Sequence, residues 1–236
     1  GDNGWCGSGS TCTNSVCVGG QTAVSGNASN PITIRAAHSR KAHLKSDGTK
    51  TPLAIYGCDY YVVDGLRTTN AGEASTSAMP PTDGGMAFTA TDHLIVRNNL
   101  LSDPNVCQNT HLLSLSFVKY ALVEGNEVYR YHRHGIIFWQ SEYIVARRNY
   151  ANSRETYTRG YCYPYDNQLY GDECIGLYGT SDSIVENSLC ENSAGSLGSH
   201  GILGYVSATE LKSGGERNRI VGTILLDNGA GGLFAG

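Results

Sequence analysis

One short motif recurs along the chain and constrains its fold more than any other feature. The motif reads apolar, apolar, charged, small, and then Asn or a substitute for it. Its six copies end at anchor residues separated by 33, 27, 23, 39 and 36 residues, namely Leu66, Asn99, Asn126, Asn149, Ser188 and Ile224. We take the shortest interval as the repeating unit and the longer ones as that unit with insertions.

A second apolar segment precedes most of the anchors. These segments read LAIY, MAF, LSLSF, IIFW, IGLY and ILGY, and GGLF near residue 236 begins one more. β-Branched runs punctuated by Gly, Asn and Asp are typical of strands and turns, and no helical period accompanies them. A strand pair of this length cannot bury its apolar side alone, so the sequence predicts that successive turns stack into a solenoid.

The repeat resembles the right-handed parallel β-helix of the pectate-lyase-like superfamily. NPITIRA is similar to the first turn of such a helix, and HGIIFWQSEYIVARRNYAN is similar to one full rung. The resemblance implies an all-β chain in which residues 1–30 form a Cys-rich lead-in and residues 31–236 the parallel β-helix, with an unfinished rung at its C-terminal end. Lyases, hydrolases, epimerases and adhesins all use this architecture, so function must be argued from a site.

Two columns of the repeat are predicted to be structural. The residues two positions before the anchors alternate in charge from rung to rung, and opposite charges on neighbouring strands attract weakly; they are Asp64, Arg97, Glu124, Arg147 and Glu186. At the anchors themselves, Asn99, Asn126 and Asn149 can donate and accept hydrogen bonds along the stack.

Composition narrows the possible partners and compartment. The 17 Lys and Arg residues are outnumbered by 21 Asp and Glu, which gives a net charge of -4 and no basic field for nucleic acid. No apolar run approaches the roughly 20 residues of a membrane span. Eight cysteines without a CxxC pair suit disulfides in an oxidising compartment. We therefore expect a secreted or cell-surface protein that binds neither nucleic acid nor a bilayer.

Chemically useful side chains gather in a column fifteen residues before the anchors. His111, His134 and Glu173 open three successive rungs there, and His200 opens the next after an insertion. Imidazoles beside a carboxylate have a tunable pKa, as a general acid or base at neutral pH requires. We expect His134 to be a base and His111 or a loop tyrosine the acid. The column could instead be a structural hydrogen-bonded ladder or a metal site; our prediction includes no metal and no cofactor.

The longest insertion directly precedes Glu173 and is rich in tyrosine and arginine. Tyrosine rings suit stacking on a pyranose, and arginine can bind a carboxylate through two parallel hydrogen bonds. We predict that Arg133 neutralises charge beside His134 and that the substrate-binding residues are Arg154, Arg159, Tyr157, Tyr161, Tyr163 and Tyr165. Alternatively, the insertion is a packed loop closed by a Cys162–Cys174 disulfide.

Two functions of different kinds fit these features. The first is a secreted polysaccharide-active enzyme, a lyase or epimerase acting on a uronate-containing polymer. Hydrolysis by paired carboxylates would need partners such as Glu142 or Asp166. The second is a non-catalytic surface, adhesive or structural β-helix segment of a longer protein or fibre, with further coils or a partner chain at the C-terminal edge.

Overall fold

The computed structural model describes residues 24–46, 51–70, 83–102, 111–131, 134–153, 173–192, 200–205, 215–227 and 233–235. For residues 83, 200–205 and 233–235 the description covers the backbone alone. Regular structure in these ranges is β-strand throughout, and they contain no helix with the length and apolarity to cross a membrane.

The strands form three sheets of seven, and every pairing within a sheet is parallel. Sheet 1 contains β1 (Ile32–Arg35), β4 (Tyr61–Asp64), β7 (Leu94–Arg97), β10 (Lys119–Glu124), β13 (Glu142–Arg147), β16 (Ile184–Glu186) and β19 (Arg219–Val221). Sheet 2 contains β2 (His43–Ser46), β5 (Arg67–Asn70), β8 (Leu100–Ser102), β11 (Glu127–Tyr129), β14 (Tyr150–Asn152), β17 (Leu189–Glu191) and β20 (Ile224–Leu226). Sheet 3 contains β3 (Leu53–Tyr56), β6 (Asp83–Thr89), β9 (His111–Ser116), β12 (His134–Trp139), β15 (Glu173–Tyr178), β18 (His200–Tyr205) and β21 (Leu233–Ala235).

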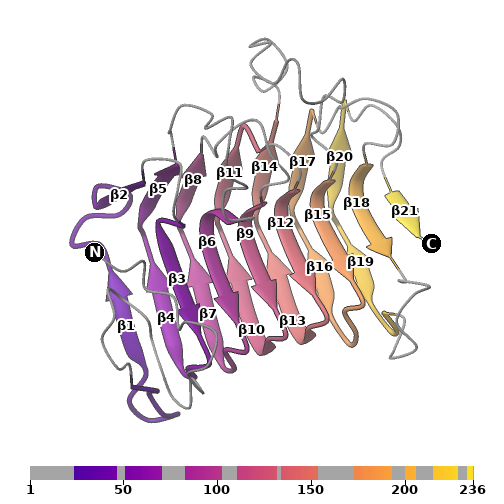
Figure 1. Ribbon diagram of the computed structural model, residues 1–236. Helices are drawn as coiled ribbons and strands as arrows, with labels where there is room; N and C mark the ends of the chain where they lie inside the picture. The colour runs from indigo at the N-terminus through magenta and orange to yellow at the C-terminus, as the bar shows by residue number, and fades with distance from the viewer. Residues whose placement is uncertain are drawn as a thin grey trace, which may run out of the picture.

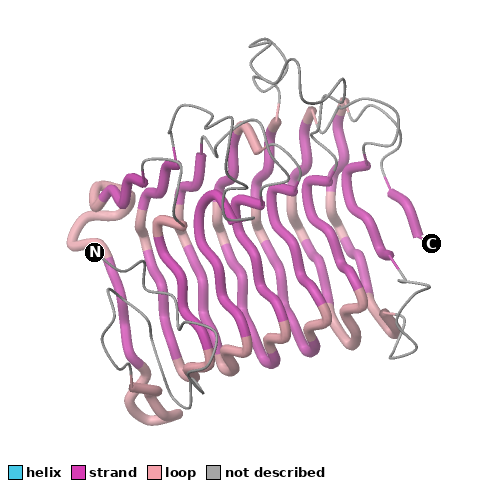
Figure 2. The backbone as a smooth tube through the Cα atoms, in the orientation of Figure 1, coloured by secondary structure: helices cyan, strands magenta, loops and turns pink. Residues whose placement is uncertain are grey.

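The chain visits the three sheets in turn and starts again, so each strand pairs with the strand three places later (Figure 1). This is a right-handed parallel β-helix, and the fold expected from the repeat is confirmed. The tube in Figure 2 shows the coils lying side by side along one axis. The apolar segments from LAIY to ILGY are the strands of sheet 3. The boundary between lead-in and β-helix at residue 30 stays a prediction, because residues 1–23 lie outside the described ranges.

Apolar side chains at alternate positions of each strand fill the interior of the coil. In sheet 1, successive rungs place Val63, Val96, Val123, Ala146 and Val185 in register, and each is at most 1% exposed. Sheet 3 contributes Phe88, Leu115, Phe138 and Leu177 to the same hydrophobic core. Because side chains on a strand alternate between its two faces, the residues directly before and after each of these core residues point outward.

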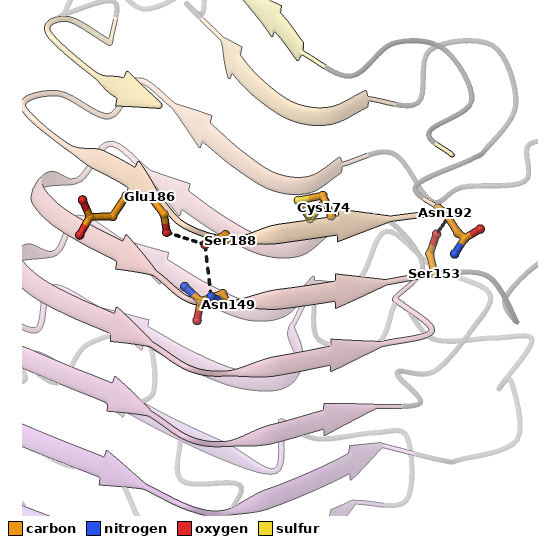
Figure 3. Close-up of a disulfide and its surroundings, with 7 residues drawn as sticks. Asn149, Ser153, Cys174, Glu186, Ser188 and Asn192 are labelled. Atoms are coloured by element: carbon orange, nitrogen blue, oxygen red, sulfur yellow. Dashed lines mark hydrogen bonds between the residues drawn. A yellow bond between two sulfur atoms is a disulfide. The ribbon is translucent and has the colours of Figure 1, made fainter. Parts of the chain in front are cut away.

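The asparagine column is a buried hydrogen-bonded ladder, as predicted. The Asn126 side-chain oxygen accepts from the backbone N–H of Asn99 at 3.1 Å, and the Asn126 amide nitrogen donates to the carbonyl of Val96 at 2.9 Å. Asn149 repeats the pattern one rung later. Ser188 then replaces asparagine, and its Oγ accepts from the Asn149 N–H at 3.2 Å (Figure 3).

The charged column is also structural. Arg97 Nη2 donates to Asp64 Oδ2 at 3.0 Å, and Arg147 Nε donates to Glu124 Oε1 at 2.8 Å. The sixth anchor, however, is misplaced by one residue. Leu189 pairs with Ile224, so Ser188 lies beside Thr223 and not beside Ile224. An insertion in the preceding interval hides this slip, because the apolar pattern of IVGTI reads similarly in either register.

The cysteine prediction is confirmed in part. Cys174 of β15 and Cys190 of β17, which are 16 positions apart in the sequence, form a disulfide (Figure 3). The proposed Cys162–Cys174 bond is therefore wrong. Cys58 is a buried free thiol that donates to the carbonyl of Tyr56. Burial, and then the neighbouring Asp59, raise the pKa of Cys58 to about 11, so this thiol stays protonated at neutral pH.

Removing the core disulfide should destabilise the coil. A Cys174→Ala/Cys190→Ala double variant frees a 16-residue loop in the unfolded chain, which should lower the free energy of unfolding by roughly 3 kcal/mol. Denaturant unfolding measures the loss. Cys58→Ala removes an equally buried sulfur that crosslinks nothing, so its effect should be clearly smaller. Equal losses in the two variants would show that the crosslink contributes nothing.

Candidate active site

The His and Glu residues of the predicted column lie side by side on neighbouring strands of sheet 3. His134 of β12 pairs in register with His111 of β9 on one side and with Glu173 of β15 on the other. Glu173 in turn pairs with His200 of β18, and His111 pairs with Asp83 of β6. The first residues of five consecutive sheet 3 strands therefore line up along the axis of the coil.

The column faces outward from sheet 3. Gly176 lies between Ile175 and Leu177, which point into the core, so a Cβ on Gly176 would point to the exterior. That Cβ would lie 2.7 Å from Ile137 Cδ1 and 3.6 Å from both His134 Cδ2 and Tyr178 Cε1. The side chains of His134 and Tyr178 thus share the exterior face, and Gly176 leaves the space that Tyr178 needs to lie back along its own strand.

Four side chains form a connected hydrogen-bonded cluster on this face. His134 Nδ1 lies 2.5 Å from His111 Nδ1, and His134 Nε2 lies 3.0 Å from the Tyr178 hydroxyl. The Tyr178 hydroxyl donates to Glu173 Oε1 at 3.0 Å, and Glu173 Oε2 is in close contact with His134 Nε2. The His111 and His134 rings are 4.5 Å apart and tilted by 35°. We call these four residues the His-Tyr-Glu cluster.

One arrangement of protons satisfies the contacts of the His-Tyr-Glu cluster. The Nε2–H of a neutral His134 can donate to the Tyr178 hydroxyl oxygen, and the Tyr178 hydroxyl donates in turn to Oε1 of an ionised Glu173. His134 Nδ1 then accepts from the Nδ1–H of His111, and the lone pair of His111 resides on its Nε2. Glu173 and His134 would thus connect two proton-carrying groups, the imidazole of His111 and the phenol of Tyr178.

Burial divides the cluster into an inner and an outer pair. The exposed fraction of His134 is 1% and that of Glu173 is 4%, whereas His111 and Tyr178 are only half-buried. A group that exchanges a proton with a polymer has to reach it. The outer pair is therefore better placed for direct contact, and the inner pair for holding it in position.

Sequence reasoning missed Tyr178. It lies at the far end of β15, five residues from Glu173, and joins the cluster only because its side chain folds back across Gly176. The available signal was the column Trp139, Tyr178 and Tyr205, which are in register at the ends of three neighbouring strands.

Several predicted site residues cannot be placed. Arg133 and the insertion residues Arg154, Tyr157, Arg159, Tyr161, Tyr163 and Tyr165 lie outside the described ranges, as does Asp166, and His200 is described by its backbone alone. Glu142 is described and forms an ion pair with Lys119 at 3.2 Å. Within the described ranges, no group of three His, Cys, Asp or Glu residues is arranged to hold a metal ion.

A second polar cluster covers the exterior of sheet 2. Tyr129 donates to Glu127 Oε2 at 2.9 Å, and Tyr150 donates to Glu191 Oε2 at 2.6 Å. Burial, and then these hydrogen bonds, raise the pKa of both tyrosines. Arg40 also donates to Glu127 Oε1 at 2.6 Å. Because each carboxylate already accepts from a fixed donor, we interpret this cluster as a structural network.

No family model and no curated protein match the chain. Among solved structures, the chain is similar to an alginate lyase from Paenibacillus sp. str. FPU-7, at 15% sequence identity and a TM-score of 0.47. The match covers 90% of this chain and 85% of that one.

Proposed function

We propose that this protein is a secreted enzyme that acts on a uronate-containing polysaccharide by lyase or epimerase chemistry. The observation that carries the proposal is the His-Tyr-Glu cluster on the exterior of sheet 3, in which the buried pair His134 and Glu173 connects two outer proton-carrying groups. Such a pair is what proton removal and proton delivery on one sugar residue require.

The reaction begins with the acidic proton beside the carboxylate, at C5 of the uronate. His111 removes this proton through Nε2, and the electron pair of the C5–H bond moves into the carboxylate to give an enolate. The imidazolium that forms on His111 is stabilised through His134 by the negative charge of Glu173. This assignment differs from the sequence-based one, since the 1% exposure of His134 favours His111 as the group that touches substrate.

The second step decides between the two reactions. In a lyase, the electron pair returns to form the C4=C5 double bond, the C4–O bond breaks, and Tyr178 donates its phenolic proton to the departing oxygen. In an epimerase, Tyr178 returns a proton to C5 on the opposite face, and no bond to oxygen breaks. Both reactions are redox-neutral and need no co-reactant. Arg133, Arg154 and Arg159 remain our proposed partners for the substrate carboxylate.

A product assay tests the proposal. The protein should be incubated with alginate, polygalacturonate and a glucuronate-containing polymer, followed by ultraviolet absorbance for unsaturated uronate and by proton NMR for inverted C5 centres. We expect one polymer to give one of these two signals. New reducing ends without unsaturation would point to hydrolysis, and no change in any of the polymers would favour the non-catalytic alternative; either result would overturn the proposal.

A further inference from the structure

Large aromatic side chains are exposed where sheet 3 passes into sheet 1. Phe117 and Tyr120 are each 51% exposed, Tyr143 is 44% exposed and Trp139 is 41% exposed. By contrast, Phe88, Phe138 and Tyr131 are completely buried. Exposed aromatic residues gathered on neighbouring rungs mark a surface that binds something or one that stabilises the coil, and the ring contacts separate the two cases.

Two of the exposed rings belong to a structural stack. Tyr60, His93, Tyr120 and Tyr143 follow one another on successive rungs, with ring centroids 4.3, 5.1 and 5.0 Å apart and nearly parallel planes. Each of the four has a left-handed backbone, with φ between 55° and 59°. Because neighbouring rings occupy both faces of His93 and of Tyr120, the exposed part of Tyr120 is its edge and its hydroxyl and not an open aromatic face.

Trp139 has a different environment. On one side Tyr178 packs against it edge-on, with centroids 5.4 Å apart and planes at 64°. On the other side its partner in register is Ser116 of β9, followed by Thr89 of β6. Neither of these side chains is large enough to cover an indole, so the indole presents apolar surface toward β9.

Phe117 is an exposed ring one rung away from Trp139. It follows Ser116 directly, and its backbone N–H donates to the carbonyl of Trp139 at 2.8 Å, so the two residues lie on adjacent rungs. Within the described ranges the Phe117 ring makes no ring contact. Trp139 and Phe117 thus form a pair of exposed rings, which we call the aromatic platform.

The aromatic platform is continuous with the His-Tyr-Glu cluster. Tyr178, which packs against Trp139, is hydrogen-bonded to both His134 and Glu173. A ligand on the indole would therefore lie next to the outer acid of the cluster. This continuity identifies the occupant, because a polymer whose reacting unit is at His111 and Tyr178 must continue past one side of that site.

We propose that Trp139 and Phe117 bind neighbouring sugar rings of the same polysaccharide chain on which the cluster acts. The C–H face of a pyranose is apolar and carries partial positive charge, so it fits the negative face of an indole or phenyl ring. This inference rests on the proposed function for the identity of the polymer. It adds a binding subsite, made of residues that take no part in proton transfer.

Binding should be measured separately from turnover. The responsive polymer is the one that reacts in the product assay. Affinity electrophoresis in gels containing it would use the His111→Ala variant as the background protein, so that the polymer is not consumed. Trp139→Ala should weaken binding about tenfold, which corresponds to about 1.4 kcal/mol of stacking. Trp139→Phe should keep most of the affinity, and Phe117→Ala should cost a smaller factor. In the active protein, Trp139→Ala should raise KM more than it lowers kcat.

Tyr120→Ala is the matched control. It removes a ring of similar exposure at a left-handed position, but one whose two faces are both covered by neighbouring rings of the stack. Its polymer affinity should equal that of the background protein. Unchanged binding in Trp139→Ala, or an equal loss in Tyr120→Ala, would overturn the platform while leaving the enzymatic proposal intact. Binding that depends on Trp139 without any turnover would support the platform and overturn the enzymatic proposal. Failure of the background protein to bind any uronate polymer, or capture of a protein ligand alone, would overturn the platform.

Discussion

Replacing Tyr178 by phenylalanine should lower kcat on the responsive polymer by about 10²- to 10⁴-fold, the usual contribution of a general acid or base. The variant loses only the hydroxyl that donates to Glu173 Oε1 and contacts His134 Nε2. The phenyl ring keeps its position over Gly176 and against Trp139. Because the ring and its packing remain, the expected change is in kcat, with KM close to that of the wild type.

The chain offers a close control for this experiment. Tyr129 is also half-buried and also donates its hydroxyl to a glutamate, Glu127 Oε2 at 2.9 Å, but it belongs to sheet 2. Tyr129→Phe should leave kcat unchanged. If the two variants lost equal activity, the loss would reflect general damage to the coil. If Tyr178→Phe retained full activity, Tyr178 would have no role in proton transfer.

Replacing Asn126 by alanine should destabilise the coil by about 3–5 kcal/mol, among the largest effects expected of a single substitution here. Asn126 is completely buried, and its side chain accepts from the backbone N–H and side-chain amide of Asn99 and donates to the Val96 carbonyl and Asn149 Oδ1. Alanine leaves these groups in the interior without that partner, and it adds a cavity. The free energy of unfolding in denaturant measures the loss.

Two other substitutions calibrate the Asn126 result. The ladder itself uses serine at Ser188, whose Oγ accepts from the Asn149 N–H, so Asn126→Ser should lose less than Asn126→Ala. Asn152→Ala removes a half-buried asparagine on the exterior of sheet 2 and should cost about 1 kcal/mol. A loss in Asn126→Ala no greater than that in Asn152→Ala would contradict the view that the ladder supports the bend between sheets 1 and 2.

Most of the fold was predictable because a solenoid turns sequence spacing into spatial register. The column of His111, His134 and Glu173 could be read from intervals alone, since parallel strands place equivalent residues side by side. The sixth anchor was predicted wrongly because the insertion before it changes the spacing. From the sequence alone, Thr223 and Ile224 are equally plausible as partners of Ser188.

The site was less predictable than the fold. The spacing of the repeat shows which residues are neighbours along the axis of the coil. It does not show how deeply a side chain is buried or which residues of its own strand it contacts. The burial of His134, which shifts the role of base to His111, depends on the packing around the ring. Tyr178 joins the cluster across Gly176, a contact within one strand that no column of the repeat records.

The central claim is that the His-Tyr-Glu cluster moves the C5 proton of a uronate. Proton NMR of the responsive polymer incubated in deuterium oxide tests it most directly, because both a lyase and an epimerase remove the proton at C5. The wild-type protein and Tyr129→Phe should erase the H-5 signal of the reacting residues, and His111→Ala, which lacks the base, should preserve it over the same time. An H-5 signal that persists with the wild type, or one that His111→Ala erases at the wild-type rate, would contradict the account.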